Sequence, residues 1–276
     1  MSTNNNLWIT KLAPTFPNFW QGLATLEECQ LIMELGTSGF LSSVQLKNLL
    51  TNPDRTIQLP GVGATLRAHQ FSDIYATGGV EKGEDHECLE LVSKDRSLKL
   101  VIRPTHPQGI RALNHLTGAF ADEIIPEGCH LALGTAPHIP KLCPCCETSG
   151  QFRVDQIEEN PITCILASSH RQNQPLMISI RSSAGSWTSN HLPERLTVMA
   201  DWLVSEGADN LMRLNIRHLH AIRYQQIIFE GEPYLSLELL NSCGEIYATI
   251  SAAQSFVEGP WNFILGCRDH PYAIHR

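Results

Sequence analysis

Apolar and polar positions alternate most clearly in the stretch from Met212 to Ser251. The alternation predicts a β-meander of three strands joined by two turns. The turn residues Glu230–Pro233 and Asn241–Gly244 divide it, since Gly, Pro, Asn and Ser favour turn conformations. The extended runs of this stretch are 212–220, 224–229, 235–240 and 245–250. The turn at 230–233 separates the second run from the third, and the turn at 241–244 separates the third from the last. This stretch is the core around which we expect the second half of the chain to be built.

A similar pattern occurs in the first half, at residues 65–103. Both stretches open on an apolar–Arg pair, pass through a Tyr-containing strand and a Gly/Glu turn, and reach a Leu-Glu-Leu triplet at nearly the same spacing. These matching features are Leu66-Arg67 with Met212-Arg213, and Leu89–Leu91 with Leu237–Leu239. Equal spacing predicts a duplicated meander that can pack with pseudo-twofold symmetry. The alternative is a chance similarity between two ordinary meanders.

The remaining pattern predicts helices and strands that flank these meanders. The expected helices are 23–35, 44–50, 107–120 and 193–204, and the expected strands are 162–167 and 176–181. The predicted fold class is therefore α+β, with two related repeats that each contain an antiparallel meander sheet and flanking helices. We expect an N-terminal repeat at 1–140, a Cys-rich linker at 141–150 and a C-terminal repeat at 151–276.

Composition narrows the class of protein. The 276 residues are 42% hydrophobic and 17% charged, as in a globular protein, and the formal charge of -8 argues against nucleic acid as the main partner. No apolar run approaches the roughly 18 residues of a membrane span. The N-terminus shows no secretory signal, and nine cysteines, an odd number, indicate reduced thiols in a cytoplasmic protein.

A family resemblance rests on Ser236–Gly244, SLELLNSCG. It is similar without a gap to a Ser-Leu-x-x-apolar-(Asp/Asn)-x-x-Gly segment of the bacterial haem-utilisation proteins, the HemS/ChuX-type hemin-degrading factors and haem carriers. Cys88–Leu116 is similar to the same segment with its closing helix, except that Arg96 replaces the glycine. The resemblance implies two repeats, each a pleated antiparallel sheet with flanking helices, and it implies haem as the cofactor.

Haem requires an apolar slot, axial donors and cations for its propionates. His218 and His220, two residues apart on a predicted strand, would share one face, and Arg213 would lie on the opposite face. His69 is the counterpart in the first half. The alternative for each histidine is an ordinary surface or hydrogen-bonded residue of a sheet.

The resemblance also raises a difficulty over the axial ligand. In the degrading factors an axial histidine follows an Ile-x-Ile-like strand of the second repeat. The matching strand here is Met177–Ile180, and Arg181 follows it. A protonated guanidinium has no lone pair for iron. The ligand would then be His170, His218 or His220, or haem binding would be lost.

The cysteines at Cys143-Pro144-Cys145-Cys146 allow several interpretations. Cys143 and Cys146 form half a zinc site that Cys129 and His138 could complete. A redox dithiol would need a helix N-terminus, and Glu147–Gly150 is not typical of a helix start. A Cys-Pro pair can also supply a thiolate ligand for haem. The simplest interpretation is that these are reduced loop cysteines that bind nothing.

The sequence thus predicts a protein that binds haem or another tetrapyrrole for trafficking or degradation in iron utilisation. The alternative is a zinc-binding or ligand-free scaffold or regulatory protein. Whether the chain is an enzyme, which residues would be catalytic, and whether it forms a homodimer are left open.

Overall fold

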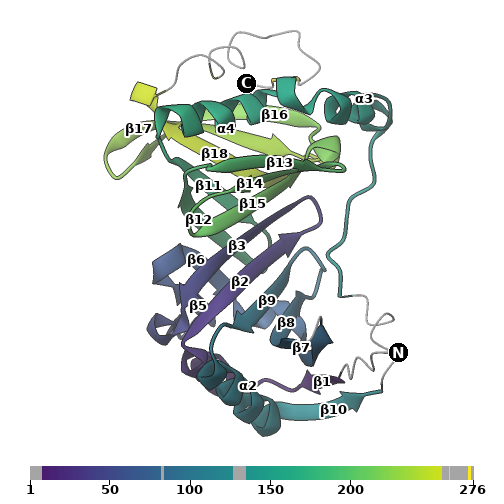
Figure 1. The fold of residues 1–276 in the computed structure, drawn as a ribbon, viewed down its shortest axis with the longest axis vertical. Coiled ribbons are helices and arrows are strands. Elements are labelled where there is room, and N and C mark those ends of the chain that lie inside the picture. The colour runs from purple at the N-terminus through teal and green to yellow at the C-terminus, as the bar shows by residue number, and fades with distance from the viewer. Residues whose placement is uncertain (1–7, 82–83, 127–134, 257–260, 262–272, 275–276) are drawn as a thin grey trace. The chain divides into compact units, whose positions relative to one another are not determined.

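The structure is a computed structural model that describes residues 8–81, 84–126, 135–256, 261 and 273–274. It is an α+β protein made mainly of antiparallel strands, with few helices, which confirms the predicted fold class (Figure 1). The chain forms two compact units. Unit 1 contains Met1–Leu35, Leu41–His138 and Ser182–Ser186, and unit 2 contains Gly36–Phe40, Ile139–Arg181 and Trp187–Arg276.

Unit 1 is built on the antiparallel strand order β10-β1-β7-β8-β9-β2, with a separate ladder β4-β5-β6. Its elements are β1 (Trp8–Leu12), α1 (Asn18–Gly22), η1 (Leu23–Leu26), β2 (Glu28–Leu35), β3 (Ser38–Gln45), η2 (Leu46–Asn48), β4 (Leu50–Thr51), β5 (Thr56–Leu59), η3 (Pro60–Val62), β6 (Ala64–Arg67), η4 (Ala68–Gln70), β7 (Phe71–Glu81), β8 (Glu84–Ser93), β9 (Lys99–Pro104), α2 (Pro107–Phe120) and β10 (Ala121–Ile125). The first three residues of β3 belong to unit 2.

Unit 2 is built on the order β19-β16-β17-β18-β11, with a separate ladder β13-β14-β15. Its elements are α3 (Pro144–Asp155), η6 (Ile157–Glu159), α4 (Pro161–Gln172), β11 (Leu176–Arg181), β12 (Gly185–His191), β13 (Arg195–Met199), β14 (Trp202–Glu206), β15 (Asn210–Asn215), η7 (Ile216–His218), β16 (Ala221–Phe229), β17 (Glu232–Leu240), β18 (Ile246–Ala253), η8 (Gln254–Phe256) and β19 (Ala273–Ile274). The first two residues of β12 belong to unit 1.

The two units repeat one order of strands. In unit 1 the neighbouring strands are β7-β8-β9-β2, and in unit 2 they are β16-β17-β18-β11. A 3-10 helix precedes the first strand of each set: η4 precedes β7, and η7 precedes β16. The registers also correspond, because Leu89 pairs with Ile102 as Leu237 pairs with Ile250. Common descent of the two units by duplication stays a prediction.

The core of unit 2 follows from the period-two pattern of β17. Leu235, Leu237 and Leu239 are buried, and they face the same side as the buried Ile250 of β18. The intervening Ser236 and Glu238 therefore lie on the opposite face of the sheet, which is polar.

The prediction of helices at 23–35 and 44–50 is wrong. Residues 23–35 form η1 and the strand β2, and residues 44–50 fall in the end of β3, in η2 and at the start of β4. In β2 every second residue is buried, as Cys29, Leu31 and Met33 show. Pairing with β9 holds this segment extended, so every second side chain points to the buried face and the period-two pattern prevails over the helical one.

Two expectations in the second half are also wrong. The strand expected at 162–167 belongs to α4, whose Asn160 cap accepts a hydrogen bond from the Ile162 amide at 2.9 Å and whose first residue is proline. The helix expected at 193–204 is instead the hairpin β13–β14. Its turn includes Ala200, which adopts a positive φ of 52°.

The strands β7-β8-β9 and β16-β17-β18 form the two expected meanders, and the helix at 107–120 is confirmed. The strand β15, expected in the second meander, instead pairs with β14. The strand expected at 212–220 ends at Asn215, and η7 follows. His218 and His220 therefore do not lie on one face of one strand. The strand ends at Asn215 because the chain enters a 3-10 turn, in which the Leu219 amide donates a hydrogen bond to Ile216 O.

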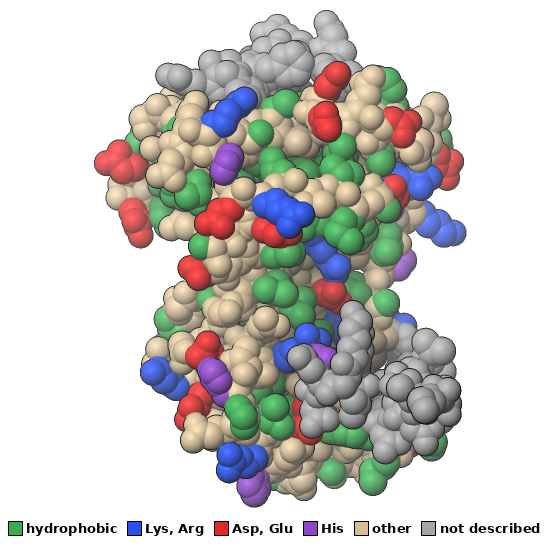
Figure 2. All heavy atoms as spheres, in the orientation of Figure 1, with side chains coloured by type: hydrophobic (Ala, Val, Ile, Leu, Met, Phe, Trp, Pro, Cys, Tyr) green, Lys and Arg blue, Asp and Glu red, His purple; other side chains and the backbone are tan. Residues whose placement is uncertain are grey.

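Charges of both signs are interspersed on the face shown in Figure 2. Among the residues that the structure describes, no helix is long and apolar enough to cross a membrane. The expectations about nucleic acid and a homodimer stay predictions.

Candidate functional site

Four potential metal ligands meet in unit 2: Cys143, Cys145, Cys146 and His220. Their donor atoms all lie within 4.8 Å of one another. His220 Nδ1 is 3.3 Å from the Cys143 Sγ, 3.6 Å from the Cys145 Sγ and 3.5 Å from the Cys146 Sγ. The cluster therefore has one nitrogen donor facing three sulfurs.

The helix α3 creates this cluster, because its first turn holds all three cysteines. Cys143 is the N-cap, and its sulfur accepts a hydrogen bond from the Cys146 amide at 3.4 Å. Pro144 occupies the first helical position, which suits its fixed φ. The expectation that no helix begins here is wrong, since α3 starts at Pro144 and runs through Glu147–Gly150.

Gly150 lets α3 pack closely against η7. A Cβ at this position would lie 3.1 Å from the carbonyl oxygen of Arg217 and 3.0 Å from its Cγ. The close approach brings the first turn of α3 to the segment that carries His220. The His220 amide in turn donates to Leu240 O at 2.8 Å, which fixes the start of β16 on the sheet.

The pKa values of the Cys143 and Cys146 thiols are shifted in opposite directions. Burial raises the pKa of the Cys143 thiol, but hydrogen bonds with Cys145 and the Cys146 amide outweigh it and leave the pKa below its usual value. Burial raises the pKa of the Cys146 thiol to about 11, although Arg153 opposes this. The Arg153 guanidinium is itself buried, lies 3.5 Å from the Cys146 Sγ and also donates to Leu219 O. The protein thus places the Arg153 cation next to the Cys146 sulfur.

The structure brings only part of the predicted metal set together. Cys143 and Cys146 are in the cluster, and Cys129 lies outside the described residues. His138 is not among the donors, and its backbone amide donates to Arg96 O at 2.8 Å within unit 1. Sequence reasoning missed Cys145, and it assigned His220 to haem. Only folding could reveal His220, which is 74 residues from Cys146 in the chain.

The other predicted haem ligands lie in different settings. His218 in η7 is buried, and its Nδ1 has no hydrogen-bond partner among the described residues. Burial, together with the charge of Arg217, lowers the pKa of His218, so its imidazole is neutral at physiological pH. His69 is exposed in η4. His170 is exposed at the end of α4, and its Nδ1 donates to Pro193 O at 2.7 Å.

His170 also lines a small pocket of about 240 Å³, together with Arg171, Glu194 and Arg195. Small-molecule sites usually enclose about 300–1,000 Å³. The pocket is thus too small for a tetrapyrrole.

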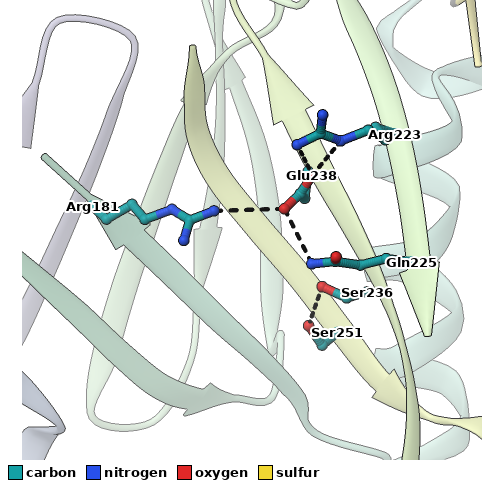
Figure 3. Close-up of polar contacts among 6 residues, drawn as sticks. All are labelled: Arg181, Arg223, Gln225, Ser236, Glu238 and Ser251. Atoms are coloured by element: carbon teal, nitrogen blue, oxygen red, sulfur yellow. Dashed lines mark hydrogen bonds and ion pairs between the residues drawn. The ribbon is translucent and has the colours of Figure 1, made fainter. Parts of the chain in front are cut away.

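Arg181 and Arg223 surround the buried carboxylate of Glu238 on the polar face of the sheet (Figure 3). Arg223 donates from Nε to Oε2 at 2.6 Å, and its Nη2 is also 2.6 Å from Oε2. The Arg181 Nη2 lies 3.5 Å from Oε1, and Gln225 donates to the same oxygen at 3.1 Å. Both guanidinium groups remain about half exposed, so this face carries two cations for one carboxylate.

Arg213, the other predicted cation, has a different contact. Its guanidinium carbon lies 5.0 Å from the centre of the Trp202 ring, which is the geometry of a cation–π pair. Glu238 is a further site residue that the sequence analysis missed, although the alternation of Ser236 and Glu238 with buried leucines could have indicated a polar face.

The fold of this chain is similar to the folds of two bacterial proteins of known structure. Similar solved structures are the haem-degrading enzyme ChuS of Escherichia coli O157:H7 and the haem-binding protein PhuS of Pseudomonas aeruginosa. The chain is 11% identical to the first, with a TM-score of 0.68 over 96% of this chain and 87% of ChuS. For haem-bound PhuS the identity is 8% and the TM-score 0.67, over 90% of this chain and 82% of PhuS.

The resemblance proposed from the sequence is thereby confirmed for the fold. No protein-family model matches the chain, and no curated protein sequence matches it.

Proposed function

We propose that this protein binds haem or a closely related tetrapyrrole in the cytoplasm and serves haem trafficking or degradation. The observation that carries the proposal is the whole-chain likeness to ChuS and PhuS, a haem-degrading and a haem-binding protein. A bound haem would supply a redox-active iron and an extended apolar ring. The chain itself would supply an axial donor and cations.

His218 is the axial donor that we propose. Its imidazole is neutral, as a metal ligand must be, and its Nδ1 has no partner among the described residues. Because a buried polar atom without a hydrogen bond is costly, an orphaned ring nitrogen fits a ligand role. His218 is buried in this structure, so haem would have to approach it through a local opening of η7.

Arg181 and Arg223 are the cations that we propose for the propionates. Glu238 fixes one side of each guanidinium, while about half of each side chain remains exposed. A guanidinium held in this way can still donate to a second carboxylate. In this arrangement Arg181 anchors the ring and leaves the iron to another residue.

The test is a hemin titration of the reduced full-length protein, followed by the Soret band. We expect saturable binding at one hemin per chain and a shifted band in His218→Ala. Arg181→Ala should weaken the affinity without moving the band, because it removes a propionate contact and no iron ligand. His115→Ala, which changes an exposed residue of α2, is the matched control and should behave as the parent protein does.

Two outcomes would contradict the proposal. A spectrum of free hemin at every protein concentration would leave the chain as a ligand-free scaffold or interaction module. Unchanged spectra in His218→Ala, together with saturable binding, would remove His218 as the ligand.

Incubation of the hemin complex with a reductant and O₂ distinguishes haem degradation from haem trafficking. Degradation bleaches the Soret band and releases iron, whereas a carrier keeps the band and the iron.

A further inference from the structure

We infer that Cys143, Cys145, Cys146 and His220 bind one Zn²⁺ in a closed tetrahedral site that fixes α3 to the start of β16. The inference is independent of haem binding. It rests on four donors that converge within one compact unit from two distant segments of the chain.

The distances suit a tetrahedral ion. Zinc lies about 2.3 Å from thiolate sulfur and about 2.1 Å from imidazole nitrogen, so tetrahedral angles separate the two donors by about 3.6 Å. The three separations from His220 Nδ1 are 3.3, 3.6 and 3.5 Å. The three nitrogen–sulfur separations are therefore those expected for one imidazole and three thiolates around a single zinc ion.

The distance between the Cys143 and Cys145 sulfurs must increase when the ion binds. The Cys143 and Cys145 sulfurs are 2.8 Å apart, whereas two thiolates on one zinc are about 3.8 Å apart. Cys145 is exposed on the first turn of α3, so its side chain is free to rotate outward by this amount. The present separation is also well beyond the roughly 2.05 Å of a disulfide bond, so Cys143 and Cys145 are free cysteines.

The donor set and its surroundings favour zinc. Three thiolates and one imidazole are soft and borderline ligands that suit Zn²⁺ in a tetrahedral site. Four protein donors leave no open position for water or substrate, which is typical of a structural site. The complex would carry one negative charge, and the buried Arg153 guanidinium, 3.5 Å from the Cys146 Sγ, lies where it offsets that charge.

Zinc would also decide the role of His220. An imidazole that ligates zinc through Nδ1 is not available to haem iron, although the sequence made His220 a candidate axial ligand. The two metals would then use neighbouring histidines, with His220 in the zinc site and His218 left for haem.

The first experiment measures the metal content of the reduced full-length protein, produced in zinc-supplemented medium and dialysed without chelator. We expect one zinc per chain by elemental analysis. Replacement of zinc by Co²⁺ should give the strong visible absorption of tetrahedral cobalt with thiolate charge-transfer bands. A chain without zinc that also fails to take up added Zn²⁺, or a chain that holds iron or copper instead, would overturn the inference.

The second experiment assigns the ligands. Cys145→Ser and His220→Gln should each lower the zinc affinity by about a hundredfold or more, because one of four bonds is lost. Cys243→Ser changes an exposed cysteine outside the cluster and should leave the affinity unchanged. Unchanged zinc affinity in both ligand variants would refute the site.

Thiol alkylation of the unmodified protein tests the zinc site even where a ligand variant fails to fold. In the unmodified protein, zinc should protect Cys143, Cys145 and Cys146 from a thiol reagent while the exposed Cys243 still reacts. Equal labelling of the three cysteines with and without zinc, or a Cys143–Cys145 disulfide in protein purified with reductant, would contradict the inference. None of these readouts depends on hemin.

Discussion

At the scale of single residues, Glu238 is a carboxylate with only 4% of its surface exposed. Removing such a charge from water is costly unless partners replace the lost hydration. Arg223, Arg181 and Gln225 provide those partners from the same sheet. The Glu238 side chain therefore holds the polar residues on this face of unit 2 in place.

We expect Glu238→Gln to lower the free energy of unfolding by about 1–3 kcal/mol. The variant removes the negative charge while both guanidinium groups stay. The loss is moderate because Arg181 and Arg223 are half exposed and water can solvate them. Urea unfolding measures it, and the exposed Glu232→Gln on the same strand should change stability by less than about 0.5 kcal/mol. Equal effects of the two variants would contradict this account.

Asp95 in unit 1 links stability to acid pH. Burial raises the pKa of this carboxyl, but hydrogen bonds from Ser183, Ser97 and Ser93 outweigh it and lower the pKa to about 2. The folded state therefore releases the proton more readily than the unfolded chain does, whose Asp pKa is about 3.9. The stabilisation is present above the unfolded pKa and is lost as the pH falls through the folded pKa.

We expect Asp95→Asn to be less stable than the parent protein at pH 7 by about 1 kcal/mol, a value reduced for the exposure of the side chain. The difference should shrink from about pH 4 downward and vanish near pH 2. Urea midpoints across this pH range measure it. Asp209→Asn, at an exposed position, is the control, and a difference that persists unchanged at pH 2 would rule out the linkage.

At the scale of elements, the turns that lead into the last strand of each meander both contain a residue with a positive φ. Gly244 lies before β18 with a φ of 78°, and Arg96 lies before β9 with a φ of 54°. Left-handed backbone costs little for glycine, whereas a side chain at such a position is strained. The glycine that is missing from the first-half segment is therefore replaced by a residue in nearly the same conformation.

Exchanging these residues gives a reciprocal prediction. Arg96→Gly should raise the free energy of unfolding by up to about 1 kcal/mol, because it removes the strain. Gly244→Ala should lower it by about 1 kcal/mol, since a Cβ there meets nothing within 4 Å and only the backbone term remains. Chemical denaturation of both variants checks the pair. A stabilised Gly244→Ala protein would contradict the argument.

At the scale of the whole molecule, unit 2 contains a short segment from the first half of the chain, Gly36–Phe40. Thr37 O accepts from the Asn215 amide at 2.9 Å, and the Ser38 hydroxyl donates to Tyr247 O at 2.9 Å. The ring of Phe40 lies 4.7 Å from that of the buried Trp187. The folding of unit 2 thus depends on residues that lie far before its main segment in the chain.

We expect Phe40→Ala to destabilise unit 2 by about 3–5 kcal/mol, the usual cost of a large cavity in an aromatic core. Amide hydrogen exchange should accelerate in β15 and β18 and remain slow in β8 of unit 1. Leu50→Ala, at an exposed position, is the control. Uniform acceleration in both units would show that the effect is not confined to unit 2.

Local chemistry determined the parts of the fold that the sequence predicted correctly. The strands β16, β17 and β18 of the second meander are separated by turns that contain Gly or Asn, and α2 begins at a proline, so neighbouring residues suffice to define them. Residues 23–35 instead carry apolar side chains that fit a helical and a strand period at once. Only pairing with β9 decided for the strand, because it holds the segment extended with Cys29, Leu31 and Met33 on one buried face.

The candidate site shows the same division. The sequence by itself determined that Cys143 and Cys146 are spaced as metal ligands and that the chain resembles haem proteins. Tertiary structure alone decided that His220 completes the set, because the donors belong to segments 74 residues apart that meet only when α3 packs on η7 through Gly150. Contacts between distant segments depend on the packing of the whole unit, and no local pattern encodes them.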